Sequence, residues 1–160
     1  MSVTFASLRQ QTAARVALIG GTWWEAPVPY EQFGPSAVPD AIPATKGHLA
    51  FAVGLIQTER GEDGTRGRTT DGMLVDTIVG VRFLARHTPG PTNSLTSQDA
   101  ALAAELALIQ QLMGRTAVAP AWPNEIKVRF DRTDSRTLNE SGEWFTTTVL
   151  FRMMHVLPLA

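Results

Sequence analysis

The residues best suited to chemistry in this sequence are three histidines, and their positions do not suggest a shared site. His48, His87 and His155 lie far apart in the sequence, and none has an acidic or cysteine partner at a metal-ligand spacing. Metal and catalytic sites need several groups that converge. We therefore interpret each histidine as a structural or surface residue, with a metal or catalytic role as the alternative.

Other motifs for catalysis or cofactor binding are also missing. The sequence has no G-x-S-x-G elbow, no Walker A loop and no dinucleotide fingerprint. Gly61, Gly64 and Gly67 recur every three residues, but no GK[ST] follows them. Four carboxylates of a turn-rich stretch are interpreted as solvated turn charges rather than as a cluster: Asp131, Asp134, Glu140 and Glu143. We predict that the chain is not an enzyme and holds no cofactor or metal.

The composition of the chain limits which classes of protein it can belong to. The chain has 160 residues, 44% of them hydrophobic, which fits one globular domain. Fourteen basic and fifteen acidic residues give a net charge of −1, so no overall positive field favours nucleic acid or an anionic membrane. The absence of cysteine excludes disulfides and thiolate sites. The N-terminus is too polar for a signal peptide and no run of about 18 apolar residues occurs, so we expect a soluble, unsecreted protein.

Two strands are predicted near the end of the sequence. The first is 124–132, where apolar and charged side chains alternate. A turn-rich run follows at 133–142, in which Asn139 and Gly142 can take left-handed backbone angles. The second strand is 143–157. One face of the second strand carries Phe145, Thr147, Val149, Phe151 and Met153, and the other carries Trp144, Thr146, Thr148, Leu150 and Arg152. Because both faces hold apolar residues, this strand is either central or meets another subunit.

A long β-hairpin is predicted in the middle of the chain. Its strands are 48–58, with a possible bulge at Gly54, and 73–87. The connecting loop, 58–72, holds four glycines and no apolar side chain. Such a loop is either inert or orders on a partner, and we favour the partner because long loops in compact domains are often functional.

Two helices complete the predicted elements. The first is capped by Ser2 or Thr4 and runs to about Ile19, where Gly20 and Gly21 stop it. Its apolar side is Phe5, Leu8, Thr12, Val16 and Ile19, with Arg9, Gln10, Gln11 and Arg15 largely opposite. The second follows a hinge at 88–94 and runs from a Thr96–Asp99 capping box to Met113, with the apolar stripe Leu102, Leu106, Ile109 and Met113.

A proline-rich arm, 22–47, joins the first helix to the hairpin. Its prolines exclude a long helix or a central strand. The arm's aromatic residues are Trp23, Trp24, Tyr30 and Phe33, and we favour the interpretation that they anchor the arm to its own domain; the alternative is that Trp23 and Trp24 form an inter-subunit anchor. Taken together, the elements predict a single α+β domain, 1–160, with a mainly antiparallel sheet of about four strands and two helices packed on one face.

This order of features resembles the tail-terminator family of long-tailed bacteriophages, whose type example comes from phage lambda. The matching parts are the N-terminal helix closed by Gly20-Gly21, the approach Ala41-Ile42-Pro43-Ala44 into a strand, and the polar hairpin loop. The capped second helix and the closing GEWFTTTVLFRMMHVLPLA complete the resemblance, which spans nearly the whole chain.

The resemblance implies a structural role in the neck of a virion. Members of this family form a ring, usually of six copies, that caps the tail tube, ends its polymerisation and docks to the head–tail connector protein. Genomic DNA would pass through the lumen without sequence-specific binding, and no membrane, cofactor or catalytic residue is implied. Assembly would take place in the host cytoplasm. Alternatives are a head-completion or connector protein and, from another class, a small enzyme or ligand-binding domain.

Nine residues are candidates for contacts with other subunits or with the tube. They come from the arm, the polar loop and the outer face of the last strand: Trp23, Trp24, Tyr30, Arg60, Arg66, Arg68, Asp71, Trp144 and Arg152.

Overall fold

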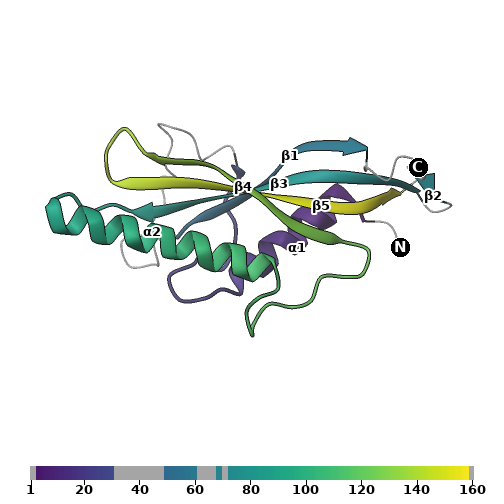
Figure 1. Cartoon of the computed structure of the whole chain (residues 1–160), viewed down its shortest axis with the longest axis horizontal. Helices are drawn as coiled ribbons and strands as arrows, with labels where there is room; N and C mark the ends of the chain where they lie inside the picture. The colour runs from purple at the N-terminus through teal and green to yellow at the C-terminus, as the bar shows by residue number, and fades with distance from the viewer. Residues whose placement is uncertain (1–2, 31–48, 61–67, 70–71, 159–160) are drawn as a thin grey trace.

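A computed structural model describes residues 3–30, 49–60, 68–69 (backbone only) and 72–158 (Figure 1). The elements in chain order are α1 (Phe5–Ala17), β1 (Phe51–Arg60), β2 (Arg68–Thr69), β3 (Gly72–Arg86), α2 (Pro91–Leu112), β4 (Lys127–Leu138) and β5 (Trp144–Pro158).

The four long strands form one open antiparallel sheet. Their order is β1-β3-β5-β4, and the two-residue strand β2 pairs with β3 beside β1. The centre of the sheet is the β3–β5 ladder, in which two 15-residue strands pair from Gly72 opposite Pro158 to Arg86 opposite Trp144. The sheet and its two helices confirm the predicted α+β fold, and β5 is central, the first of the two alternatives that its apolar faces left open.

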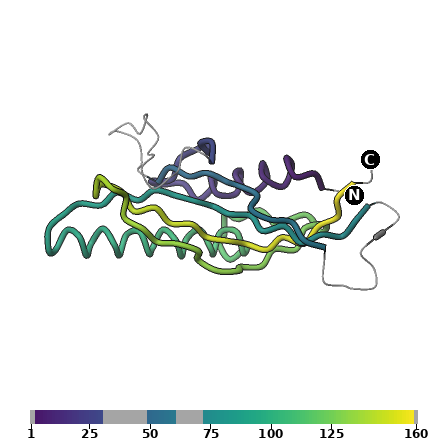
Figure 2. The backbone as a smooth tube through the Cα atoms, turned by 90° about the horizontal axis from the view of Figure 1, so that it is seen from above, coloured from purple at the N-terminus to yellow at the C-terminus, as the bar shows by residue number. Residues whose placement is uncertain are grey.

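Both helices pack on the same face of this sheet, here called the helix face. On β5 this face holds the odd-numbered residues: Thr12 of α1 donates a hydrogen bond to Met153 Sδ at 3.8 Å, whereas α2 lies near Phe145 and Thr147. The helices therefore cover successive parts of one twisted face, and Figures 1 and 2 show them displaced along the length of the sheet. The main core lies between them and the sheet, and its largest fully buried apolar side chains include Leu8, Phe51, Phe83, Leu108, Leu112, Phe151 and Met153.

A smaller cluster lies on the opposite face, at the start of β1. Ala50 and Ala52 pack with Leu84 and Trp144 there, and residues Trp24, Val28 and Tyr30 of the arm cover them. The arm is tied to the sheet by backbone bonds from Trp24 N to Leu49 O at 3.2 Å and from Val28 N to Phe51 O at 2.9 Å. The rest of the predicted arm, 31–47, lies outside the described residues.

The first helix follows its sequence prediction closely. Thr4 is the N-cap and its side chain accepts a hydrogen bond from Ser7 N at 3.1 Å, while Gly20 and Gly21 have φ of 74° and 64°. Arg15 is the exception, because it is buried rather than on the solvent side. Its guanidinium donates to Gln11 O and Ala121 O and stacks on the Trp122 ring, so local contacts replace water.

The second helix differs from its prediction in both start and orientation. It begins at Pro91 with Gly90 as N-cap, so the expected hinge is already helical, and Thr96 donates to Thr92 O within the helix instead of capping it. Proline at the first helical position suits this start, since its missing N–H would have no partner there. The side facing the sheet carries Ala101, Ala104, Leu108 and Leu112, whereas Leu102 and Leu106 of the expected stripe are exposed. The buried side thus combines small alanines with the fully buried Leu108 and Leu112, and it lies on another side of the helix than the predicted stripe.

Strand β4 is longer than predicted. Residues 133–138, expected as turn, pair with β5, and the register shifts twice, between Phe130 and Arg132 and between Thr133 and Ser135. Gly142 has the expected positive φ of 72°, but Asn139 acts through its side chain, which accepts from Glu143 N and Trp144 N at 3.1 Å each. In β1 the irregularity falls between Leu55 and Gln57 rather than at Gly54. Segments 58–60 and 68–69 of the predicted loop are strand.

Candidate functional site

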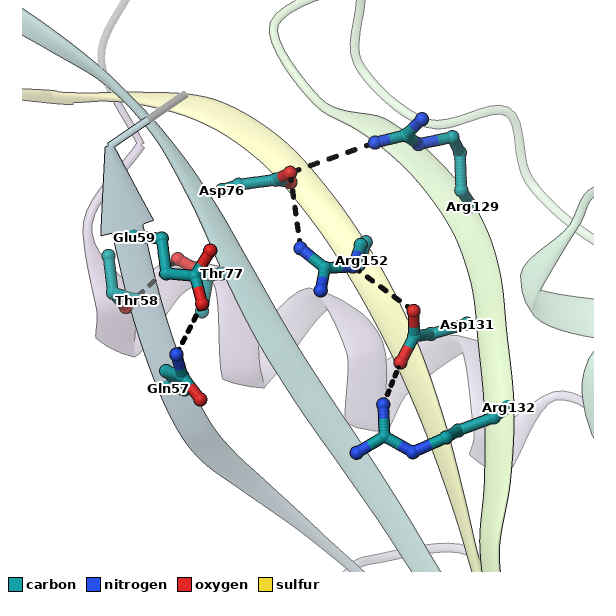
Figure 3. Close-up of polar contacts among 9 residues, drawn as sticks. All are labelled: Gln57, Thr58, Glu59, Asp76, Thr77, Arg129, Asp131, Arg132 and Arg152. Atoms are coloured by element: carbon teal, nitrogen blue, oxygen red, sulfur yellow. Dashed lines mark hydrogen bonds and ion pairs between the residues drawn. The ribbon is translucent and has the colours of Figure 1, made fainter. Parts of the chain in front are cut away.

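The main concentration of charge among the described residues lies on the sheet face opposite the helices (Figure 3). We call it the charged cluster: Asp76, Arg129, Asp131, Arg132 and Arg152. Arg152 donates from Nε to Asp131 Oδ1 at 3.0 Å, and its Nη1 lies 3.7 Å from Asp76 Oδ2. Arg129 reaches the same Asp76 oxygen at 3.7 Å, and Arg132 pairs with Asp131 at 2.5 Å. The cluster joins β3, β5 and β4 across the sheet.

Asp76 is the buried member of this cluster. The residue is only 4% exposed, and its Oδ1 has no hydrogen-bond partner among the described residues. The two arginines at 3.7 Å supply the positive charge that a buried carboxylate requires. The carboxylates also act on Arg152: the hydrogen bond to Asp131, together with the charges of Asp131, Asp76 and Glu59, raises the pKa of Arg152 above its usual value.

The ion pairs of the charged cluster link neighbouring strands of the sheet to one another. Each of its carboxylates already faces arginine, so neither is a free base, and each arginine faces a carboxylate, so the net field for an anion is weak. Sequence reasoning missed this arrangement. The available signal was Asp76, the single acidic residue of strand β3.

The two described histidines hold separate parts of the fold together. His155 Nε2 lies 2.8 Å from Thr77 Oγ1, and Phe5 packs edge-on against its ring. Burial lowers the pKa of His155 below 6.5, against smaller opposing effects of the Val3 backbone and Asp76. His87 contacts Gly142 O at 2.7 Å and Ser94 Oγ at 3.0 Å. The two rings share no partner, in agreement with their interpretation as structural residues; His48 lies outside the described residues.

A second ion pair fixes α2 to β4. Arg136 donates to both oxygens of Glu105, from Nε at 2.7 Å and from Nη2 at 2.8 Å, and Thr133 also donates to this carboxylate. Burial raises the pKa of Glu105, but the hydrogen bonds from Arg136 and Thr133 outweigh it and lower the pKa overall. Beside this pair is a cavity of about 230 Å³, floored by Phe145, Thr147 and Ala101.

The predicted aromatic contacts of the arm fall within this chain. Trp23 is 7% exposed and packs against the rings of Phe51 and Phe83, so it anchors its own domain, the first of the two alternatives. Tyr30 receives the Arg82 guanidinium over its ring at 4.6 Å. A Cβ on Gly54 would lie 2.8 Å from that ring, so the bare backbone of Gly54 makes room for Tyr30.

Two of the other predicted contact residues, Trp24 and Trp144, lie in one cluster with Tyr30. Trp144 is buried on the arm side of the sheet, which removes it as an exposed contact residue, and Trp24 is half-buried there. Arg152 belongs to the charged cluster, and Arg60 is exposed at the end of β1. Arg66 and Asp71 lie outside the described residues, and Arg68 is described only as backbone of β2. Of the six candidates whose side chains are described, the structure brings Trp24, Tyr30 and Trp144 together in the smaller cluster, whereas Trp23, Arg60 and Arg152 lie elsewhere.

A further cavity lies between α1, the arm and β1. It measures about 810 Å³ and is lined mainly by apolar side chains, with Arg9 as its single charged residue among the described lining. In the described part of the chain, no group of three or more acidic or histidine side chains could hold a metal ion. No described helix is long and apolar enough to cross a membrane.

Comparisons with known proteins leave the family open. No protein-family model matches the chain, and no curated protein matches it.

Proposed function

We propose that this chain is a tail-terminator subunit of a long-tailed bacteriophage. In this role, copies of the chain form a ring on the end of the tail tube, stop its polymerisation and dock to the head connector. The proposal draws on the order of sequence features and on the α+β plan, in which two helices cover one face of an open antiparallel sheet.

The observation that carries the proposal is that the sheet has two unlike outer edges. Strand β1 forms one and β4 the other. Beyond the bond from Val28 to Phe51, no described segment pairs with the outer side of β1, and none pairs with the outer side of β4. A contact between one edge and the other edge of the next copy is heterologous, and heterologous contacts close into rings when the rotation between copies allows it.

The edges are suited to contact through side chains rather than by continuation of the sheet. Strand β4 has two register shifts, and four basic and two acidic residues lie along it. Bulges and charges of this kind protect an edge from uncontrolled strand addition. An assembly contact at β4 therefore depends on charge matching with the neighbour, which restricts pairing to the intended partner.

The test measures native mass with and without tail-tube protein from a candidate phage. We expect the chain to form rings of about six copies when tube is added, as the resemblance implies, and electron microscopy should show one ring at a tube end with tube growth stopped. A chain that leaves the length and ends of the tubes unchanged overturns the proposal.

A further inference from the structure

The outer side of α2 carries an exposed apolar ridge. Leu95, Leu102 and Leu106 are 63%, 49% and 55% exposed. Ile109 and Met113 continue the line but are half-buried and pack against the main core with their inner sides, and the exposed Asp99 interrupts the line. We call this line of six residues, from 95 to 113, the α2 ridge.

The spacing of the α2 ridge is that of a helix-pairing seam. Successive members are separated by 4, 3, 4, 3 and 4 residues. This alternation is the one that sets apolar residues along the contact line of paired helices. The fold does not need the exposed leucines for its own core, because α2 faces the sheet with a different set that includes Ala101, Ala104 and Leu108. Figures 1 and 2 show no described element on the outer side of α2.

We propose that the α2 ridge pairs with the α2 ridge of a second copy of this chain, in antiparallel orientation. The spacing is the same read in either direction, with its centre at position 104. A two-fold axis there sets Leu102 opposite the other copy's Leu106, Leu95 opposite its Met113, and Asp99 opposite its Ile109. An isologous contact requires such a self-complementary patch.

Charge selects the antiparallel orientation. Helix α2 contains two acidic residues, Asp99 and Glu105, and no basic residue. Parallel helices in register would place Asp99 against the same residue of the other copy. Antiparallel helices separate the two Asp99 side chains by ten residues along the axis, about 15 Å at the helical rise. The antiparallel arrangement also sets the N-terminus of each helix beside the C-terminus of the other, which is electrostatically favourable.

The contact is small, so the pair should be weak. The α2 ridge spans 19 residues, 95–113, which is about 27 Å of helix. A single helix pair of this length buries less than the roughly 1,200–2,000 Å² of stable interfaces. Pairing should therefore depend strongly on concentration. It concerns the free chain and does not rest on the proposed ring, which uses the sheet edges.

The first experiment measures the mass of the free chain by sedimentation over a series of concentrations. Wild type should shift from monomer towards dimer as concentration rises, and Leu106→Lys should remain monomeric. Leu18→Lys is the matched control, because Leu18 is 51% exposed but lies at the end of α1. Asp99→Leu should move the transition to about tenfold lower concentration, since it replaces the polar position of the seam. Circular dichroism checks that each variant is folded.

The second experiment determines orientation by disulfide trapping, for which the chain has a clean background without cysteine. Leu95→Cys and Met113→Cys should cross-link when the two proteins are mixed and oxidised. Leu95→Cys alone should not, because antiparallel pairing leaves its two sulfurs about 27 Å apart along the axis. Cross-linking of Leu95→Cys to itself, with no disulfide between Leu95→Cys and Met113→Cys chains in the mixture, overturns the antiparallel arrangement.

A wild-type chain that is monomeric at every concentration overturns the pairing, and so does a dimer that persists in Leu106→Lys. Rings on tail tube with an unchanged monomer in solution would support the proposed function and reject this inference. A dimer that Leu106→Lys abolishes, formed by a chain that leaves the tubes unchanged, would support this inference and reject the proposed function.

Discussion

Arg136 of β4 donates two hydrogen bonds, of 2.7 and 2.8 Å, to Glu105 of α2, one to each carboxylate oxygen. This pair is the main polar link between α2 and the edge strand of the sheet. Glu105 is buried while Arg136 remains half open to solvent, so the carboxylate depends on its partners more than the guanidinium does.

Glu105→Gln should lower the free energy of unfolding by about 2 kcal/mol, because a buried acceptor loses charge-assisted hydrogen bonds. Chemical denaturation at neutral pH measures the change. Asp99→Asn is the matched control: it neutralises an exposed carboxylate on the same helix and should change stability by less than about 0.5 kcal/mol. Equal effects of the two substitutions would contradict the role of the pair.

Acid should destabilise the fold through His155. Its pKa is lowered in the folded chain from 6.5, so the unfolded chain takes up the proton first as pH falls. Stability is therefore full above about pH 6.5 and declines below it, down to the lowered folded pKa. His155→Gln should flatten the profile in this range, measured as melting temperature from pH 7.5 to 5. An unchanged slope in His155→Gln would assign the decline to other groups.

Glu105 should add a separate loss at lower pH. Because its folded pKa is lowered from 4.5, its contribution is present above about pH 4.5 and disappears as pH falls through the folded value. The difference in stability between wild type and Glu105→Gln should therefore shrink between pH 5 and 3. Acid titration of both proteins by circular dichroism tests this, and a constant difference over that range would argue against the pair as its source.

Trp23→Ala should destabilise the free chain by about 3–5 kcal/mol, since it empties the space between Phe51 and Phe83. Trp24→Ala should cost less because Trp24 is only half-buried. Thermal unfolding of dilute protein separates this effect from association. If Trp23→Ala melted like wild type, its place in the core would be wrong.

Gly54→Ala should displace Tyr30, because the added methyl group would lie 2.8 Å from the ring. We expect a loss of about 1–3 kcal/mol, typical of overpacking. Tyr30→Ala removes the obstacle, so Gly54→Ala should cost markedly less in that background. A double-mutant cycle measures the coupling, and additive effects would show that the ring moves aside freely.

The sequence predicted the architecture because its strongest patterns were those of the core. Alternation along 143–157 assigned both faces of β5, and Thr4 with Gly20 and Gly21 delimited α1. Prediction failed where local rules compete. A capping box at Thr96 was outweighed by Pro91, and Leu102 and Leu106 were assigned to the core although the buried side of α2 carries Leu108 and Leu112.

The candidate contacts were less predictable than the fold. Trp23 and Trp144 looked like interface residues because they are large and aromatic, but the same properties bury them in this chain. The charged cluster escaped prediction because Asp76, Asp131 and Arg152 come from three strands. Only the strand order and register bring them together, and neither can be obtained from one strand at a time.

The central position of β5 also determines when the sheet can form during translation. β5 is the last strand in chain order, yet it lies between β3 and β4. A nascent chain that has emerged only as far as β4 can pair β1 with β3, but β4 has no neighbour until β5 leaves the ribosome. The β3–β5 ladder joins residues far apart in sequence, which slows folding. Helix α2 packs on β5 as well as on β3, so it lacks part of its binding surface until β5 emerges, whereas α1 packs mainly on β1 and can dock earlier.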